Sequence, residues 1–247
     1  TARKVLLHIG QVMRYAVSTG RAERDPTPDL KGALAPVEQR HMPAPEDPRE
    51  VGALLRVIDG YQGTPVVRAA LRLLPLLFVR PGELRHMRWE QVDLEAAEWR
   101  FTASKTGHAH LVPLARQAVA ILEELRPHTA HLPGGWVFPG ARSALRPLSV
   151  EAINAAYRRM GIDTRNEITA HGWRAVARTL LAERLGYEPD VVEHQLGHEV
   201  PDRLGRAYNR TRFLEQRREM MQRWADYLDM LREGDKVVVL PVTGRNR

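Results

Sequence analysis

The stretch Thr169–Arg174 has the sequence Thr-Ala-His-Gly-Trp-Arg and leads into small and aliphatic residues at helical spacing, such as Leu180 and Leu181. This periodicity predicts a helix that begins within the stretch. His171 and Arg174 would then lie one turn apart on one face, where both side chains can reach one ligand. On their own, such residues would be a helix cap and a solvated side chain, so their interpretation depends on the rest of the chain.

Residues of complementary chemistry flank this pair on both sides. The six residues, in chain order, are Arg80, Lys105, His171, Arg174, His198 and Tyr208. Together they supply two guanidinium groups, an ammonium, two imidazoles and a phenol. These are the groups needed to break a phosphodiester through a phosphotyrosine without a metal. The context of the other tyrosines is that of helices and loops, which leaves Tyr208 as the candidate nucleophile.

Reaction chemistry assigns a role to each group. An attacked phosphodiester carries negative charge on its non-bridging oxygens, and the planar forks of Arg80 and Arg174 can grip those oxygens bidentately. A tyrosine hydroxyl has an unperturbed pKa of about 10 and needs a base or nearby positive charge to lose its proton. His171 and the two arginines can supply both, and His198 can add a hydrogen bond to the phosphorane.

Lys105 is the candidate acid that protonates the departing 5′-oxygen. Only four of the 37 basic residues are lysines, in a chain that otherwise uses arginine. Trp99–Thr102 and His110–Leu114 are predicted to form two short β segments, with Thr106-Gly107 as the turn between them. Lys105 would then project from a hairpin, although a lone turn lysine is more often only solvated.

The order and flanks of these residues resemble the tyrosine recombinase, or phage integrase, family. Arg80–Leu84 matches the family's first box, Arg-x-x-Glu-Leu, and Leu196–His198 matches its third. The run Ala-Tyr-Asn-Arg around Tyr208 is similar to genomic-island and satellite-phage integrases. Two departures are Val79, where the family usually has Gly, and an interval of ten residues from His198 to Tyr208, one more than the commonest spacing.

The resemblance implies a mainly α fold with a small antiparallel β-sheet (α+β), like a tyrosine recombinase catalytic domain. It implies a site-specific recombinase that cleaves and rejoins DNA through a 3′-phosphotyrosine, without metal, cofactor or ATP, to integrate or excise a mobile element. The implied partners are double-stranded DNA attachment sites and three further copies of the chain in a homotetramer on DNA. A directionality factor or a host DNA-bending protein is a further partner of this class. Glu83 is expected to support the site without acting in catalysis.

Other functions stay open at this point. A type IB topoisomerase would use the same chemistry without choosing a site, and a catalytically silent relative would bind DNA through a basic surface alone. His194 and His198 also have the i, i+4 spacing of metal ligands, but Gln195 stands where a zinc protease needs Glu. His194 is therefore expected to be structural, and no metal site is predicted.

Composition favours an intracellular protein with a polyanionic partner. The chain has 247 residues, a formal net charge of +7 and no cysteine. The charge favours DNA or RNA as the partner. The lack of cysteine excludes disulfides, thiolate metal sites and a cysteine nucleophile, and fits a reducing compartment. No apolar run approaches the roughly 18 residues of a membrane span. A bacterial cytoplasmic location near the nucleoid, without membrane contact, is expected.

The chain is predicted to contain two parts. Residues 1–43 look like the C-terminal remnant of a helical core-binding domain plus a Pro-rich linker, with the rest of that domain cut away. Residues 44–247 would form the catalytic domain. Its C-terminal helix carries a narrow apolar seam from Leu214 to Leu231, which can pack on its own domain or on a neighbouring protomer. Lys236–Val242 is a candidate edge strand.

Overall fold

The computed structural model describes residues 2–35, 43–103, 107–198 and 213–234. The chain divides into two compact units, Thr1–His41 and Met42–Arg247. The smaller unit contains α1 (Ala2–Ser18) and the 3-10 helix η1 (Thr27–Leu30). The assignment of residues 1–43 to a core-binding domain and of 44–247 to a catalytic domain stays a prediction.

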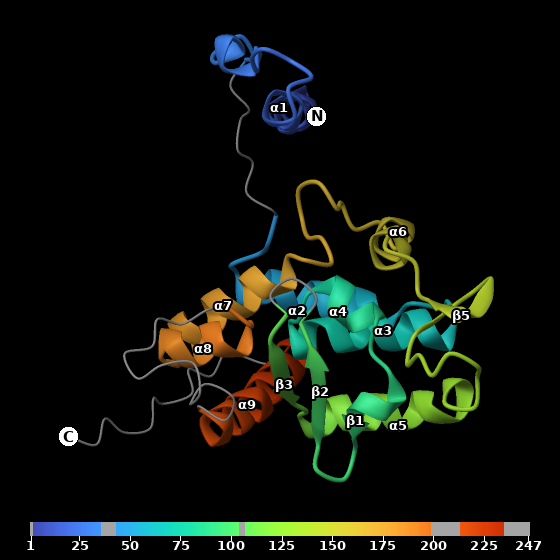
Figure 1. The fold of residues 1–247 in the computed structure, drawn as a ribbon. Coiled ribbons are helices and arrows are strands. Elements are labelled where there is room, and N and C mark those ends of the chain that lie inside the picture. The colour runs from blue at the N-terminus through green and yellow to red at the C-terminus, as the bar shows by residue number, and fades with distance from the viewer. Residues whose placement is uncertain (1, 36–42, 104–106, 199–212, 235–247) are drawn as a thin grey trace. The chain divides into compact units, whose positions relative to one another are not determined.

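The larger unit is built around α3 (Pro65–Leu77), whose side chains are mostly buried from Ala69 onward. The Thr64 side chain caps the first turn by accepting a hydrogen bond from the Val67 N–H, at 3.4 Å. The other helices of this unit are α2 (Pro48–Asp59), α4 (Pro81–Arg85), α5 (Arg116–Thr129), α6 (Ala152–Arg159), α7 (Trp173–Glu183), α8 (Pro189–Gln195) and α9 (Leu214–Glu233), with a short 3-10 helix η2 (Trp89–Gln91). Helices α2, α4, α5, α6, α7 and α9 all contact α3 (Figure 1).

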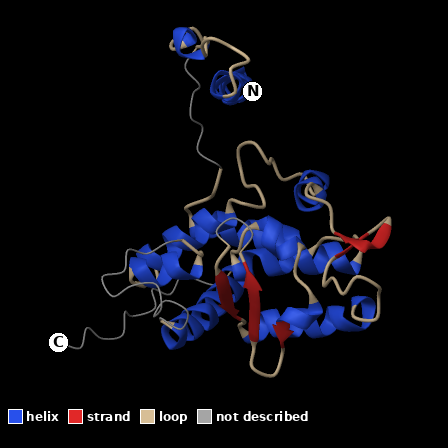
Figure 2. Ribbon diagram, in the orientation of Figure 1, coloured by secondary structure: helices blue, strands red, loops and turns tan. Residues whose placement is uncertain are grey.

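Two small antiparallel sheets complete the larger unit (Figure 2). The first has the order β1 (Val92–Asp93), β2 (Glu98–Thr102), β3 (Ala109–Pro113), and the second pairs β4 (Pro139–Gly140) with β5 (Ser143–Pro147). Trp99 faces Val112 and Phe101 faces His110 across β2 and β3. The predicted hairpin and the mainly α, α+β fold class are thus confirmed. Lys105, in the loop between the two strands, lies outside the described residues.

Helix α9 packs on its own unit over its described length. Met221, Trp224, Leu228 and Leu231 of the predicted seam are buried, and α9 contacts α2, α3, α8 and β3. Gly52 of α2 allows the closest approach, since a Cβ there would come within 2.3 Å of the Leu231 carbonyl oxygen. Of the two arrangements open from sequence, the structure shows packing within the chain. The candidate edge strand Lys236–Val242 lies outside the described residues.

Among the described residues, no helix combines the length and apolar character that crossing a membrane requires.

Candidate active site

The candidate site forms around the end of α8, where the chain reverses at Gly197. Gly197 has a φ of +66°, in the left-handed region that suits glycine. The His198 N–H donates to the Glu193 carbonyl at 3.0 Å, and the Gly197 N–H donates to the His194 carbonyl at 3.1 Å. These two bonds form a Schellman motif, which folds the residue after the glycine back over the last helical turn. The Leu-Gly-His box is therefore a helix-ending motif that places His198 beside Glu193.

Arg174 of α7 reaches this reversal from below the surface, with only 6% of the residue exposed. Its Nη1 donates to the Phe78 carbonyl at 3.2 Å, and its Nη2 donates to the Leu196 carbonyl at 2.9 Å. The same Nη2 lies 2.9 Å from His198 Nε2. Burial, with the nearby charge of Arg80, lowers the pKa of Arg174 to about 10. The guanidinium is still charged at neutral pH and lies close to a second cation.

Arg80 is the N-cap residue of α4 and approaches the same segment. Glu83 holds it twice: one carboxylate oxygen accepts from the Arg80 backbone N–H at 3.1 Å, and the other accepts from Nη1 at 2.9 Å. Arg80 Nη2 donates a longer bond, 3.4 Å, to the Gly197 carbonyl. The predicted support from Glu83 is present as an ion pair. The left-handed backbone conformation in this segment falls on Phe78, which has a φ of 38°, and not on Val79. Val79 therefore stands where the family usually has Gly without needing a backbone that favours glycine.

The structure thus brings together three of the six predicted site residues: Arg80, Arg174 and His198. His171 is exposed and lies in the turn before α7, which begins at Trp173. The helix begins at Trp173, within the predicted stretch, but His171 lies in the turn before it, so the expectation that His171 and Arg174 share one helix face was wrong. The Arg174 N–H still donates to the His171 carbonyl at 3.2 Å. Tyr208, like Lys105, lies outside the described residues.

Sequence inspection missed a group of residues that hold the site's framework. Arg217 of α9 is 1% exposed; its Nε donates to Gln195 Oε1 at 2.8 Å, and its Nη2 donates to the Leu111 carbonyl of β3. His110 of β3 lies 3.2 Å from the Gln195 carbonyl, and burial together with nearby Arg217 lowers its pKa to about 3. His110 is therefore neutral at physiological pH. The two described ends that flank Tyr208 in sequence, α8 and α9, are tied together through Arg217.

Glu193 and Arg178 are the other residues that sequence inspection missed. The Glu193 carboxylate contacts His198 Nδ1 through one oxygen and accepts from Arg178 Nε through the other. Residues five apart do not share a helix face, so the periodicity of α8 gave no signal for this contact. The one sequence signal for the contact is Gly197 itself, since a glycine at this position favours a helix end that returns the next residue toward Glu193.

Trp224 of α9 supports the helix that leads into Arg80. Its Nε1 donates to the Pro75 carbonyl at 2.9 Å in the buried last turn of α3, and its ring meets Phe78 edge-on, at 6.1 Å between centroids. Phe78 in turn supplies the carbonyl that receives Arg174. The core contact and the candidate site therefore share one short backbone segment.

Trp224→Phe is expected to lower the free energy of unfolding by about 1–3 kcal/mol, because it leaves the buried Pro75 carbonyl without its donor. Trp136→Phe is the matched control, since its Nε1 donates to Leu145 on the exposed β5 strand, where water can replace it. That change should cost less than about 1 kcal/mol. Urea unfolding followed by circular dichroism measures both, and equal losses would contradict the proposed support.

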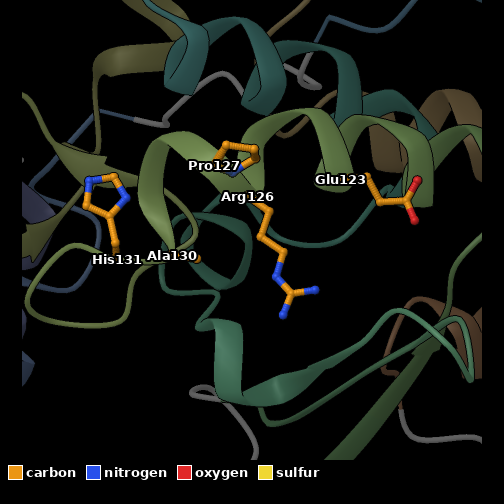
Figure 3. Close-up of a pocket in the computed structure, with 5 residues that line it drawn as sticks. All are labelled: Glu123, Arg126, Pro127, Ala130 and His131. Carbon is orange, nitrogen blue, oxygen red and sulfur yellow. The ribbon is translucent and has the colours of Figure 1, made fainter.

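The described residues contain no candidate metal cluster, and a pocket elsewhere on the larger unit does not coincide with the site. No group of three or more His, Asp or Glu side chains suited to a metal occurs in the part of the chain that the structure describes. His194 packs its ring edge-on against Phe213, at 6.1 Å between centroids. An open pocket at the end of α5 is lined by Glu123, Arg126, Pro127, Ala130 and His131 (Figure 3). It contains none of the predicted site residues.

Comparison with known proteins gives the family. The pattern that defines the phage integrase family matches residues 47–215, which is most of the chain. The chain belongs to the phage integrase family. A second pattern, the phage integrase central domain, matches residues 1–33.

Among relatives of this phage integrase family member, the integrase of Enterobacteria phage P4 is 36% identical over 246 residues, which cover 94% of this chain and 55% of the relative. Prophage integrase IntZ of Escherichia coli (strain K12) is 38% identical over 239 residues, covering 95% and 57%. The chain therefore spans little more than half the length of these relatives.

Solved structures of family members share the fold. A lambda integrase (75-356) dimer bound to a COC′ core site aligns with a TM-score of 0.58 at 19% identity, covering 81% of this chain and 72% of that one. The integrase from mycobacterium phage Brujita aligns with a TM-score of 0.56 at 17% identity, covering 92% and 75%.

Proposed function

We propose that this chain is the strand-transferring part of a site-specific DNA recombinase that integrates or excises a mobile element. The observation that carries the proposal is the convergence of Arg80, Arg174 and His198 on the Leu196–His198 reversal. Two guanidinium groups held this close repel each other, and a bound phosphate would relieve that repulsion. Membership of the phage integrase family and the net charge of +7 favour DNA as the source of the phosphate.

The proposed reaction is a transesterification with balanced bonds and protons. The Tyr208 oxygen attacks phosphorus, while the bond from phosphorus to the 5′-oxygen breaks and leaves a 3′-phosphotyrosine. The tyrosine proton passes to His171, and Lys105 protonates the 5′-oxygen as it departs. Arg80, Arg174 and His198 stabilise the charge on the non-bridging oxygens. Attack by a 5′-hydroxyl reverses these steps and rejoins DNA without ATP.

The proposed partners follow from the same reaction. Double-stranded DNA attachment sites are the substrate, and recombination between two sites requires four strand cleavages. Four copies of the chain on two DNA sites would supply one tyrosine for each cleavage. Among the structures with the same fold is a lambda integrase tetramer bound to a Holliday junction, which is consistent with this arrangement.

Trapping the covalent intermediate tests the proposal. The chain is incubated in EDTA with nicked suicide duplexes, in which cleavage releases a short fragment at the nick and so prevents rejoining. The duplexes carry a randomised central segment, so that any sequence preference can be read from the trapped DNA. DNA that stays attached after denaturation is sequenced, and the attached peptide is identified by mass spectrometry. Attachment to Tyr208 through a 3′-phosphate is the expected result.

Four outcomes would overturn the proposal. Attachment at another residue would reassign the nucleophile, and a requirement for divalent metal would exclude the proposed chemistry. DNA binding without any adduct would favour a silent DNA-binding protein. Relaxation of supercoiled DNA without sequence preference among the trapped fragments would favour a type IB topoisomerase.

A further inference from the structure

The ring of His198 has a different kind of partner at each nitrogen. Nδ1 contacts a carboxylate oxygen of Glu193, and Nε2 lies 2.9 Å from Arg174 Nη2. A guanidinium has no acceptor, so Nε2 must accept this bond and Nδ1 must carry the ring proton. The proton on Nδ1 is donated to Glu193. The arrangement therefore sets both the orientation and the tautomer of the imidazole.

Two further contacts hold Glu193 in place. Its backbone carbonyl accepts from the His198 N–H at 3.0 Å, within the Schellman motif. Its second carboxylate oxygen accepts from Arg178 Nε, and only 22% of the Glu193 side chain is exposed. Burial raises the pKa of the Glu193 carboxyl, but the hydrogen bonds from His198 and Arg178 outweigh it and leave the pKa below its ordinary value. The carboxylate is thus ionised at neutral pH.

We propose that Glu193 is a positioning residue that holds His198 ready to donate a proton-bearing Nε2 to the DNA phosphate, an inference that rests on the proposed function. In the DNA-free arrangement Nε2 presents a lone pair to Arg174. A phosphate oxygen is a hydrogen-bond acceptor, so Nε2 of His198 must carry a proton in order to bind it. The ring takes one proton from water when the phosphate binds, and as an imidazolium it donates Nδ1–H to Glu193 and Nε2–H to the phosphate.

The charges around the ring show why this carboxylate matters. Among the residues that the structure describes, the charged groups of this cluster are Arg174 and Arg178 of α7, Arg80 at the N-cap of α4, Glu83 of α4 and Glu193 of α8. Removing Glu193 leaves three arginines against one carboxylate. The contact with His198 is one cause of the lowered pKa of Glu193, so the Glu193 carboxylate and a positively charged ring stabilise each other, and Glu193→Gln removes that charge. Glutamine keeps the size and an acceptor oxygen, which makes the change one of charge.

Histidine NMR on the DNA-free chain tests the contact without using activity. Long-range proton–nitrogen spectra assign the His198 signals by their loss in His198→Ala. The unaltered protein should show the Nδ1–H tautomer at high pH, and at a given lower pH Glu193→Gln should have a smaller fraction of doubly protonated His198 than the unaltered protein. Glu124→Gln is the matched control, because Glu124 also pairs with an arginine, Arg72, but on the exposed face of α5. Identical His198 spectra in Glu193→Gln and in the unaltered protein at every pH would overturn the proposal.

The pH profile of adduct formation tests the role in the reaction. With Glu193→Gln, the loss of rate toward high pH should begin at a lower pH than in the unaltered protein, so that the rate is about tenfold lower on that limb. At lower pH the two rates should converge, and in a His198→Ala background Glu193→Gln should have no further effect. A loss by one constant factor at every pH would identify a purely structural role and overturn the proposal. Absence of adduct in the unaltered protein would instead overturn the proposed function, and the reaction role of Glu193 with it.

Discussion

Tyr208→Phe is expected to reduce covalent attachment to DNA to the background of a reaction without protein. Phenylalanine keeps the ring but has no oxygen to bond to phosphorus, and no other residue supplies a nucleophile in the proposed reaction. DNA binding should be retained, because the arginines that grip the phosphate are unchanged. The measurement is the amount of denaturation-resistant complex on the trapped suicide substrate, alongside DNA affinity from fluorescence anisotropy.

Tyr61→Phe is the matched control for the nucleophile. Tyr61 lies between α2 and α3, and its hydroxyl accepts a hydrogen bond from Arg159 Nη2 at 3.1 Å. The change removes the same atom from a tyrosine that does not belong to the proposed site. It should leave the adduct yield unaltered. Covalent complex formed by Tyr208→Phe in normal yield would show that another residue attacks the phosphate.

Arg174→Lys is expected to lower the rate of adduct formation at saturating DNA by about 10²–10³-fold, the loss typical when one donor to a transition-state oxyanion is removed. Lysine keeps the positive charge but loses the planar fork. Nη1 and Nη2 of Arg174 reach the Phe78 and Leu196 carbonyls from two separate nitrogens, whereas an ammonium places all its donors on one atom and lacks the planar fork that matches phosphate. The rate of adduct formation should fall more than the DNA affinity does, because the guanidinium's paired hydrogen bonds are strongest to the negative charge that develops on the non-bridging oxygens in the transition state.

A stability measurement separates this effect from simple unfolding. Arg56→Lys is the matched control, because Arg56 Nη1 also donates to two backbone carbonyls, those of Leu231 and Arg232, both at 3.2 Å. The free energy of unfolding of both variants is measured in urea, and the adduct rate is measured at a temperature where both remain folded. A rate loss in Arg56→Lys as large as that in Arg174→Lys would show that the loss comes from a general effect on the folded state and not from the contact of Arg174 with phosphate.

Local sequence patterns predicted the elements that carry the site. The apolar run Pro65–Leu77 and the Pro81-Gly82 breaker after it are local signals for α3 and for a junction at Arg80, as the structure has them. The alternation around Trp99 and His110 predicted the β2–β3 hairpin. The start of α7 at Trp173 falls within the predicted stretch, but His171 was wrongly placed on the helix, because His171 and Gly172 form a turn before it. A helical spacing does not distinguish the last residues of a turn from the first of a helix.

The sequence by itself therefore determined the family, the fold class and the chemical types of the six candidate residues. Each of these depends on residue identity and short spacing. Tertiary structure decided which groups touch: Arg174 reaches the Phe78 carbonyl, Arg217 joins α9 to α8 and β3, and Glu193 meets His198. Most of these contacts join segments far apart in the chain, and even the short one requires the reversal at Gly197. Such contacts are fixed by how buried faces pack together, and periodicity along one segment carries no record of the partner that will cover it.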